Sequence, residues 1–396
     1  MAARKDRGRL PNGAGSIYQR ASDSKWVGAT YVLTTDGTRH RKVVYGATWE
    51  EAHNKLLALQ DRDRRGLPAP HDAPTVAEYL DYWLEQIVHV ARRPATYAKY
   101  ESMIRVHLVP HLGDKRVDRL TVADCQRFAN GRLAAGHTPT TVHTMIATLG
   151  AALNRAMREE VLTRNVAQLV TLPSTPPTTR PLWTPDQLRH FLASSREDPL
   201  YPALTLMAHY GLRRGEVLGL RWTDIDTAAG LIRVSNQLQR IRGELIQGPP
   251  KSYAGRRTLP LLEPVAAVLD QQRERQALDR DLAGLFWVES GLVLTTSTGN
   301  PIEPRNVNRS FSRLCKEADL PELSPHDMRH LCATLLKDLG VPARDAMSIL
   351  GHSRISMTLE VYTASGDVAH RTALDRVSEA LRQPPRRPPP SPGLSR

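Results

Sequence analysis

The side chains with the most potential chemistry lie between Ser324 and Tyr362, near the end of the chain. His326 and Arg329 are three residues apart, so a helix that begins at Ser324 would project both from one face of its first turn. His352 follows, and Tyr362 comes ten residues after it. Cationic side chains at a helix N-terminus oppose the helix dipole unless an anion binds there. We therefore expect Arg, His and Tyr side chains to converge on one phosphate, although capping and packing alone could also explain each residue.

Two earlier segments carry weaker signals. Two glycines bracket Arg213 and Arg214 in a tight turn between predicted helices, and Glu216 follows, where it could orient a guanidinium. Lys251 follows two prolines in a turn between two predicted strands, at the tip of a hairpin. Taken alone, the first segment is equally explained as a surface turn with an ion pair worth roughly 0–1 kcal/mol, and the second as a solvated lysine.

Metal and disulfide chemistry are not indicated. His326 and His330 show the i, i+4 spacing of metal ligands on a helix, but the glutamate of an HExxH motif is missing and Arg329 lies beside them. The three cysteines are odd in number and show no CxxC spacing: Cys125, Cys315 and Cys332. We therefore expect no metal site, no cofactor and no disulfide framework, and a reducing compartment.

Length and charge indicate the class of partner. The chain has 396 residues and a formal net charge of +13, which favours two or three domains and a polyanionic partner. The basic excess lies near the two ends, while the region 179–380 is nearly balanced. The N-terminus is polar and basic and no stretch reaches transmembrane length, so we expect neither a signal peptide nor a membrane span.

The elements that would position these side chains fall into three blocks, separated by proline-rich linkers at 67–74 and 172–181. In the first block, 1–66, we expect strands over 16–20, 25–34 and 38–45 and a helix that begins with a capping box at Thr48 and Glu51. In the second block, 74–172, helical spacing predicts four helices, over 76–87, 94–108, 121–135 and 138–160.

The third block, 183–381, mixes helices with strands, the strands being expected over 231–242, 244–246, 256–261 and 291–296. Helices over 324–339 and 342–350 and a short one over 356–363 would carry the residues of the opening stretch. The Pro/Arg-rich tail, 382–396, is expected to be disordered.

Basic side chains on the first two blocks are candidates for nucleic-acid contacts. Beside Trp26 and Tyr31, the predicted sheet carries Lys25, Arg39, Arg41 and Lys42, and a small sheet can read DNA from a groove. The polar faces of the predicted helices could bind the phosphates of a duplex through Arg92, Arg93, Lys99, Lys115 and Arg116. An ordinary solvated face is the alternative for both sets.

Five motifs follow one another along the chain: GLRRGE at 211–216, PPK at 249–251, HDMRH at 326–330, LGH at 350–352 and the tyrosine at 362. In this order and spacing they closely resemble the motifs of the tyrosine recombinase family, the phage integrases and their relatives. The three blocks also resemble the integrase layout: an arm-DNA-binding domain of three strands and a helix, an all-α, SAM-like core-DNA-binding domain of four helices, and a mixed α+β catalytic domain. No catalytic position departs from the family's pattern, although the step from His352 to Tyr362 is slightly long.

The resemblance implies a set of catalytic residues for cleaving a DNA phosphodiester: Arg213, Lys251, His326, Arg329, His352 and the nucleophile Tyr362, supported by Glu216. A phenol with a free pKa of about 10 needs a base and a positive field, and His326 is the implied base. The two arginines would stabilise a phosphorane-like transition state, the lysine would protonate the departing 5′-hydroxyl, and His352 would hydrogen-bond the phosphate. A 3′-phosphotyrosyl link retains the energy of the broken bond, so neither ATP nor metal is required, in keeping with the lack of a P-loop motif.

The function implied by the resemblance is a site-specific recombinase that integrates or excises a mobile element. Its partners would be double-stranded DNA attachment sites and further copies of itself in a tetramer, with an excisionase and a host DNA-bending protein as further candidates, in the bacterial cytoplasm. A type IB-like topoisomerase is an alternative, which the separate arm-like domain disfavours. A non-catalytic DNA-binding regulator is another, and it would be expected to lack at least one catalytic residue, whereas none is missing.

Overall fold

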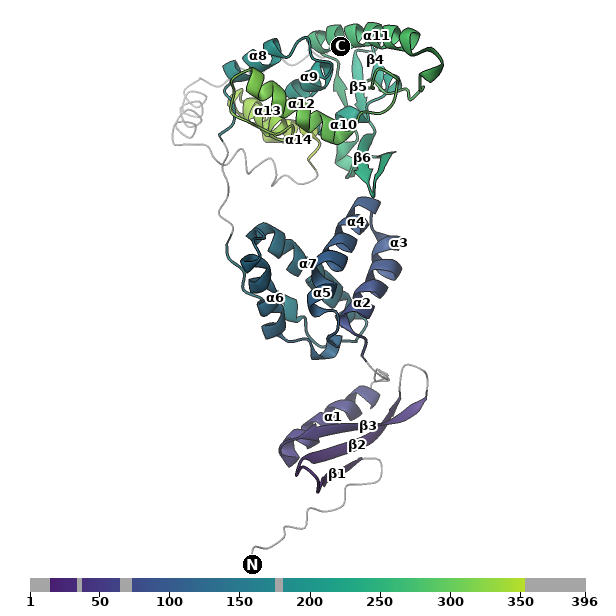
Figure 1. Ribbon diagram of the computed structural model, residues 1–396, viewed down its shortest axis with the longest axis vertical. Helices are drawn as coiled ribbons and strands as arrows, with labels where there is room; N and C mark the ends of the chain where they lie inside the picture. Colours follow the sequence, from purple (N-terminus) through teal and green to yellow (C-terminus); the bar gives the residue numbers. More distant parts are fainter. Residues whose placement is uncertain (1–14, 34–37, 65–72, 175–180, 353–396) are drawn as a thin grey trace, which may run out of the picture. The chain divides into compact units, whose positions relative to one another are not determined.

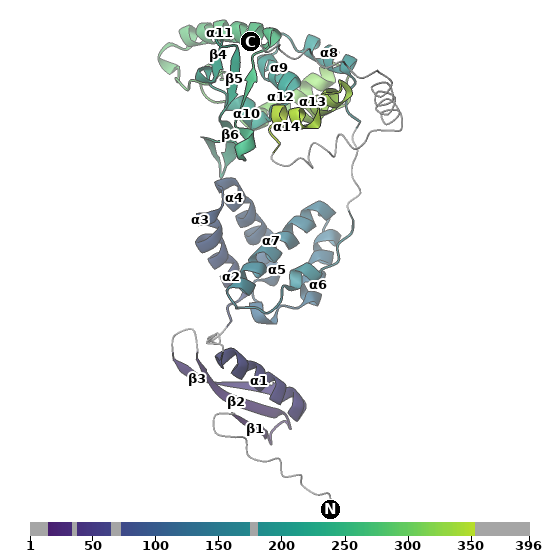
Figure 2. The same ribbon diagram turned by 180° about the vertical axis from the view of Figure 1, so that it is seen from behind.

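The computed structural model of the chain describes residues 15–33, 38–64, 73–174 and 181–352 (Figure 1; Figure 2 gives the view from behind). The chain divides into two compact units, residues 1–177 and 178–396. We call the described parts of the first unit the sheet module, 15–64, and the helical module, 73–174. Among the described helices, none is both long and apolar enough to cross a bilayer.

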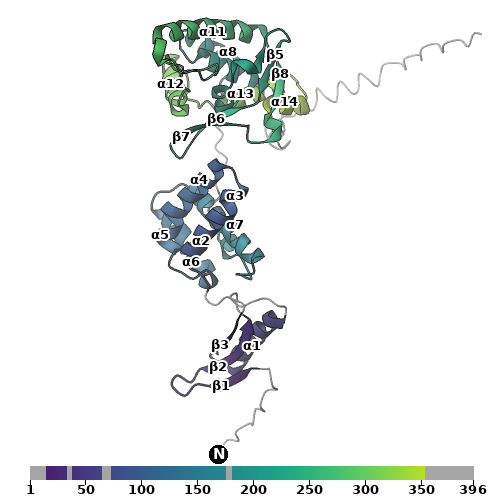
Figure 3. The ribbon, with the colours of Figure 1, turned by 90° about the vertical axis from the view of Figure 1, so that its right-hand side faces the viewer.

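The sheet module is a three-stranded antiparallel sheet with one helix. Strands β1 (Ser16–Gln19), β2 (Trp26–Leu33) and β3 (Arg39–Gly46) pair in chain order, and helix α1 (Trp49–Arg64) covers one face (Figure 3). The helix approaches closely because Gly28 faces it: a Cβ there would lie 3.3 Å from the carbonyl oxygen of Ala52. The Glu51 amide donates to the Thr48 hydroxyl at 3.2 Å, which confirms the predicted helix start. The predicted helix end near Gly66 lies outside the described residues.

The helical module packs the predicted helices around one apolar core. The first runs through α2 (Val76–Tyr82), the π-helical η1 (Trp83–Val88) and α3 (His89–Ala91), and the second through α4 (Pro94–Met103), the π-helical η2 (Ile104–Leu108) and α5 (Val109–Leu112). Helices α6 (Val122–Ala134) and α7 (Pro139–Arg158) follow, with 3₁₀ turns η3 (Val117–Arg119) and η4 (Val166–Leu169). The first two helices extend further than predicted because Val88 and Leu112 also face the core.

The second unit is built around helix α9 (Tyr201–Tyr210), most of whose side chains are buried. The rings of Trp183, Phe191 and Phe311 pack in the same core, with centroids 4.7 and 5.2 Å apart along the series. The other helices are α8 (Pro185–Ser194), α10 (Arg214–Leu218), α11 (Glu263–Ala283), α12 (Pro304–Glu317), α13 (Asp327–Asp338) and α14 (Ala343–Leu350), with 3₁₀ turns η5 (Trp222–Asp224), η6 (Tyr253–Gly255) and η7 (Gly284–Phe286).

The strands of the second unit differ from the predicted pattern. They are β4 (Ile225–Asp226), β5 (Leu231–Val234), β6 (Gln237–Ile241), β7 (Glu244–Gly248) and β8 (Arg257–Pro260). Residues 231–242 are therefore two strands: β5 pairs with β4 and β8, whereas β6 pairs with β7. The break falls at Ser235, whose hydroxyl donates to Asp224 Oδ1 at 2.7 Å. The predicted strand over 291–296 is also wrong, because that described segment forms isolated bridges only.

This strand pattern moves Lys251 off the hairpin tip on which we expected it. The hairpin is β6–β7, and its tip is at Arg242 and Gly243, which both have a positive φ. Lys251 instead lies in the loop between β7 and β8, which belong to different sheets. Pro249 and Pro250 start this loop, and a proline cannot donate to a strand ladder.

Candidate active site

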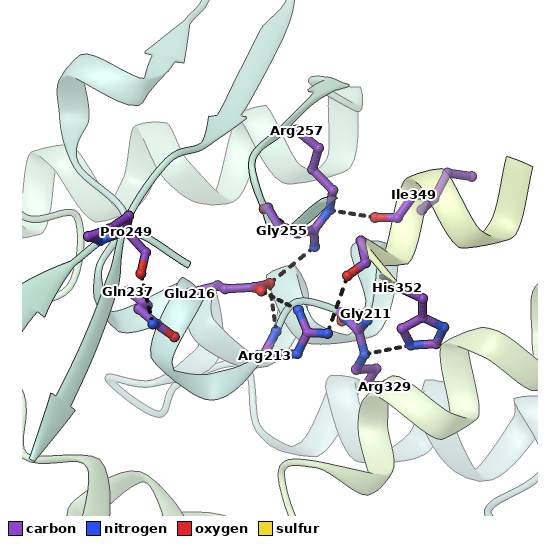
Figure 4. Close-up of polar contacts among 11 residues, drawn as sticks. Gly211, Arg213, Glu216, Gln237, Pro249, Gly255, Arg257, Arg329, Ile349 and His352 are labelled. Carbon is purple, nitrogen blue, oxygen red and sulfur yellow. Dashed lines mark hydrogen bonds and ion pairs between the residues drawn. The ribbon is translucent and has the colours of Figure 1, made fainter. Parts of the chain in front are cut away.

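Helix ends in the second unit bring together three of the predicted catalytic side chains, those of Arg213, Arg329 and His352 (Figure 4). Gly211 ends α9 in the left-handed conformation, with φ 59°, and two residues later Arg213 is the N-cap of α10. Arg329 lies in the first turn of α13, and His352 follows Gly351, which ends α14. The close approach of α9 and α14 requires a glycine, because a Cβ on Gly211 would lie 2.5 Å from a methyl group of Leu350.

Helix α13 begins two residues later than predicted. The Ser324 amide and hydroxyl both donate to Asp327 Oδ2, at 2.8 and 2.7 Å, so the acidic side chain of the first turn satisfies the preceding backbone. His326 is consequently the N-cap residue and Arg329 lies three residues after it. The predicted grouping of both side chains at this helix start holds.

Glu216 is the acidic centre of the cluster. It is almost fully buried, and its Oε1 accepts from Arg213 Nη1 at 2.6 Å while its Oε2 accepts from Arg257 Nη2 at 3.1 Å. Burial alone would raise the pKa of Glu216, but the charges of Arg257 and Arg213 outweigh it and hold the pKa below its usual value. The carboxylate therefore stays ionised and fixes the direction of both guanidinium groups.

Arg329 is a buried cation, and one of its nitrogen atoms has no hydrogen-bond partner among the described residues. Its Nη1 donates to the Gly211 carbonyl at 2.8 Å and its Nε to His352 Nε2 at 3.2 Å, whereas Nη2 has no hydrogen-bond partner among the described residues. Burial, and then the charge of Arg213, lower its pKa to about 9. A buried N–H group without a partner is costly, so this donor is suited to an anionic ligand.

His352 is a buried, neutral imidazole. Burial, followed by the charges of Arg329 and Arg213, lowers its pKa to about 4. Because Nε2 accepts from Arg329, the proton of the neutral ring is on Nδ1. Neutrality at physiological pH keeps His352 from repelling the two arginines.

His326 lies at the margin of the cluster. The residue is exposed, but its ring is shielded enough to lower its pKa, and the nearby charges of His330, Arg329 and Arg213 act in the same direction. The rings of His326 and His330 are perpendicular, with centroids 5.1 Å apart. With its pKa lowered, His326 is unprotonated at neutral pH, which is the state that a general base requires.

The structure does not bring every predicted catalytic residue into this cluster. Lys251 is exposed on its loop, and Tyr362 lies outside the described residues, as does the predicted helix over 356–363. The described cluster is therefore Arg213, Glu216, Arg329 and His352, with His326 at its edge.

Two family models match the chain, one described as the phage integrase family over residues 182–368 and one as the phage integrase N-terminal SAM-like domain over residues 75–133. The chain belongs to the phage integrase family. A "Tyrosine recombinase XerC-like" protein of Caldanaerobacter subterraneus is 28% identical over 347 residues, which are 83% of this chain and 89% of that protein. An integrase of Streptomyces ambofaciens is 29% identical over 374 residues, 91% of this chain and 94% of that protein.

The fold is also that of solved integrases. The Tn1549 transposon integrase, in complex with a circular intermediate DNA, has a TM-score of 0.68 at 24% identity, covering 77% of this chain and all (100%) of that one. A lambda integrase fragment, solved as a dimer bound to a core site, has a TM-score of 0.56 at 20% identity, covering 74% of this chain and 97% of that one. The predicted fold class, with its sheet, helical and mixed α+β parts, is confirmed.

Sequence reasoning about this recombinase missed Arg257. Its side chain is buried, and it donates to Glu216, to the Ile349 carbonyl at 2.6 Å and to the Gly255 carbonyl at 3.0 Å. In the sequence it is only one arginine of the pair that opens a predicted strand. Its partner Ile349 lies 92 residues away, so no local pattern indicates the contact.

The basic residues predicted on the sheet module do not share one surface. Arg41 is opposite the exposed Tyr31 in the β2–β3 ladder, on the face away from α1. Lys42 points to the other face, because side chains alternate along a strand. Arg39 forms an ion pair with Asp63 of α1, and Lys25 lies in the turn before β2, 3.9 Å from Asp23.

The basic residues predicted on the helical module also divide into two groups. Arg92, Arg93 and Lys99 are exposed around the turn from α3 to α4. Lys115 and Arg116 lie at the start of α2, where the Val76 amide donates to the Lys115 carbonyl at 2.7 Å. Lys115 pairs with Asp124 at 3.1 Å and Arg116 with Asp118 at 3.1 Å. The first helix, about 24 Å long at 1.5 Å per residue, separates the two groups.

Proposed function

We propose that this chain cleaves and rejoins DNA strands at specific sites, through a 3′-phosphotyrosyl intermediate, to integrate or excise a mobile element. As a member of the phage integrase family it is a tyrosine-type site-specific recombinase. The observation that carries the proposal is the buried guanidinium of Arg329, whose Nη2 has no partner in the described residues and which lies beside Arg213 and His352. This is a donor set for one phosphodiester.

The two arginines would bind the non-bridging oxygens of the scissile phosphate. Arg329 would use its buried Nη2, which has no hydrogen-bond partner among the described residues. Arg213 keeps about a third (31%) of its side chain exposed, and its Nη2 makes only a long, 3.3 Å hydrogen bond to the Gly351 carbonyl. As negative charge grows on these oxygens in the transition state, each fixed donor contributes about 3–4 kcal/mol.

The proton transfers would use His326, at the margin of the cluster, together with Lys251 and Tyr362. The phenol oxygen of Tyr362 attacks phosphorus and gives its proton to neutral His326. The bond from phosphorus to the 5′-oxygen breaks, and that oxygen takes a proton from the Lys251 ammonium. Rejoining reverses both transfers, with a 5′-hydroxyl as the attacking group and the phenol as the leaving group.

We further propose the partners and the division of the chain that go with this reaction. The DNA sites would be double-stranded, and four copies would assemble on them, as in the lambda integrase tetramer solved on a Holliday junction. An excisionase and a host bending protein would set direction in the bacterial cytoplasm. Residues 1–66 would bind arm sites, 74–172 and 183–381 would hold the core site, and 382–396 would be a tail.

Covalent trapping tests the reaction. The substrate is a nicked duplex that carries the element's candidate attachment core, incubated without metal with wild type, Tyr362→Phe or the control Tyr253→Phe. Tyr253 serves as the control because it is 91% exposed and lies between β7 and β8, so its loss removes a phenol without disturbing a core. A denaturation-resistant adduct with wild type and Tyr253→Phe, but not with Tyr362→Phe, is expected. Tight binding without any adduct from wild type would instead favour a DNA-binding regulator.

The domain division has its own test. Deleting residues 1–66 should weaken binding to distal arm sites while leaving core-site cleavage possible, because the hydrophobic cores of the helical module and the second unit include none of the described residues of 15–64. Equal losses of binding at arm and core sites would contradict the division.

A further inference from the structure

The loop that carries Lys251 is held at both ends, although Lys251 itself is exposed. We call residues 249–256, between β7 and β8, the Lys251 loop. Inside it, the Gly255 amide donates to the Ser252 carbonyl at 3.0 Å and the Arg256 amide to the Tyr253 carbonyl at 2.9 Å. The loop therefore has a defined turn, whose place in the site depends on its two ends.

Gln237 fixes the start of the loop. This residue, the first of β6, is buried, and its Nε2 donates to the Pro249 carbonyl at 2.9 Å (Figure 4). The end of α10 packs directly on it, because a Cβ at Gly219 would lie 2.6 Å from Gln237 Cα. The start of the loop is thereby located relative to α10, whose N-cap is Arg213.

Arg257 fixes the end of the loop. Its Nη1 donates to the Gly255 carbonyl, while Nη2 and Nε bind Glu216 and the Ile349 carbonyl (Figure 4). One buried guanidinium thus joins the Lys251 loop, the carboxylate that orients Arg213, and the last turn of α14 before His352.

A second contact supports the same connection. Gly351, with φ 68°, lies against the loop so closely that a Cβ there would be 2.8 Å from the Ala254 carbonyl oxygen and 2.7 Å from Arg257 Nη1. The turn that presents His352 and the loop that carries Lys251 are therefore packed on each other.

We propose that Gln237 and Arg257 are positioning residues for strand cleavage. They hold the two ends of the Lys251 loop at fixed positions relative to Arg213 and Arg329. The inference rests on the proposed function, and in particular on Lys251 as the acid that protonates the leaving 5′-oxygen. Neither residue touches DNA in this role. Removing either contact releases one end of the loop and misplaces the ammonium group.

The test compares two leaving groups in single-turnover cleavage. One nicked duplex has the ordinary 5′-oxygen at the scissile bond, and the other has sulfur there, whose thiol pKa of about 8.5 lets it leave without a proton donor. The variants are Lys251→Ala, Gln237→Leu and Arg257→Met. The control is Gln239→Leu, which changes the same residue type on the same strand, at a partly buried position.

Lys251→Ala should be strongly impaired on the oxygen substrate and close to wild type on the sulfur substrate. Gln237→Leu should lower the cleavage rate of the oxygen substrate about ten- to a hundredfold, the loss that an ångström-scale misplacement of a catalytic group produces. It should lower the cleavage rate of the sulfur substrate by less than about threefold. Arg257→Met should lower the cleavage rate of the oxygen substrate more than Gln237→Leu does, because Glu216 also loses a partner. The sulfur substrate should restore the greater part of this loss, the part caused by the displaced loop. Gln239→Leu should match wild type on both.

Equal losses on both substrates for Gln237→Leu would overturn the inference, because a merely structural role affects both leaving groups alike. An unchanged rate on oxygen would overturn it as well. If Arg257→Met does not fold, Gln237→Leu decides, since it removes one hydrogen bond to the loop and no ion pair. Failure of sulfur to restore Lys251→Ala would instead refute Lys251 as the acid, and no adduct from wild type on either duplex would refute the proposed function itself.

Discussion

Acidification should destabilise the second unit through His352. Its pKa is lowered from 6.5 to about 4 in the folded chain, by burial and then by Arg329 and Arg213. Between these two values the unfolded chain binds a proton that the folded chain does not, so stability falls as the pH falls through this window. Above pH 6.5 the imidazole is neutral in both states and the penalty is absent. At about pH 4.5 the difference in proton binding corresponds to roughly 2–3 kcal/mol.

The assay is denaturant unfolding of the full chain at pH 7.0 and at pH 4.5, for wild type and for His352→Asn. Asparagine does not titrate, and its side-chain oxygen can still accept a hydrogen bond from Arg329. Other groups titrate alike in both proteins, so the variant should lose roughly 2–3 kcal/mol less than wild type on acidification. If both lose the same stability, His352 is not held neutral by burial beside the arginines, and the electrostatic account of the site is wrong.

Three further changes test the packing and the charges. Gly351→Ala would place a Cβ 2.8 Å from a backbone oxygen at φ 68°, and should cost roughly 2–3 kcal/mol in denaturant unfolding. The control is Gly340→Ala, at φ 74° in open space, which should lower the free energy of unfolding by about 1 kcal/mol. Equal losses for the two alanine variants would refute the close packing at Gly351. Glu216→Gln removes a buried carboxylate shared by two arginines and should lower the free energy of unfolding by about 3–5 kcal/mol. A loss of less than about 1 kcal/mol would show that solvent screens the two ion pairs. Arg41→Ala should reduce the salt slope of arm-DNA binding by about one, and Lys42→Ala, on the helix-covered face, should not; the reverse order would refute the assigned face.

The local elements could be predicted from the sequence, and so could the grouping of Arg213, Arg329 and His352 in one cluster; the catalytic roles stay a prediction. Capping boxes and strand alternation act over a few residues, so the helix start at Thr48 and the three strands of the sheet module followed from local physics. The stripe of apolar residues determined the helices of the helical module in the same way. The arginine and histidine motifs indicated a phosphate site because their order and spacing resemble one family.

Contacts between distant segments were decided only by the tertiary structure. Strand pairing split residues 231–242 between two sheets and placed Lys251 in a loop, which the alternation of side chains along one strand does not determine. Arg257 donates a hydrogen bond to the Ile349 carbonyl, 92 residues further along the chain, and only the folded chain brings the two together. The left-handed turn at Gly351 places the last carbonyls of α14 beside two arginines, and Arg213 reaches the Gly351 carbonyl across 138 residues of chain. Burial in that assembled site, rather than any local motif, makes His352 neutral and leaves Arg329 Nη2 without a hydrogen-bond partner among the described residues.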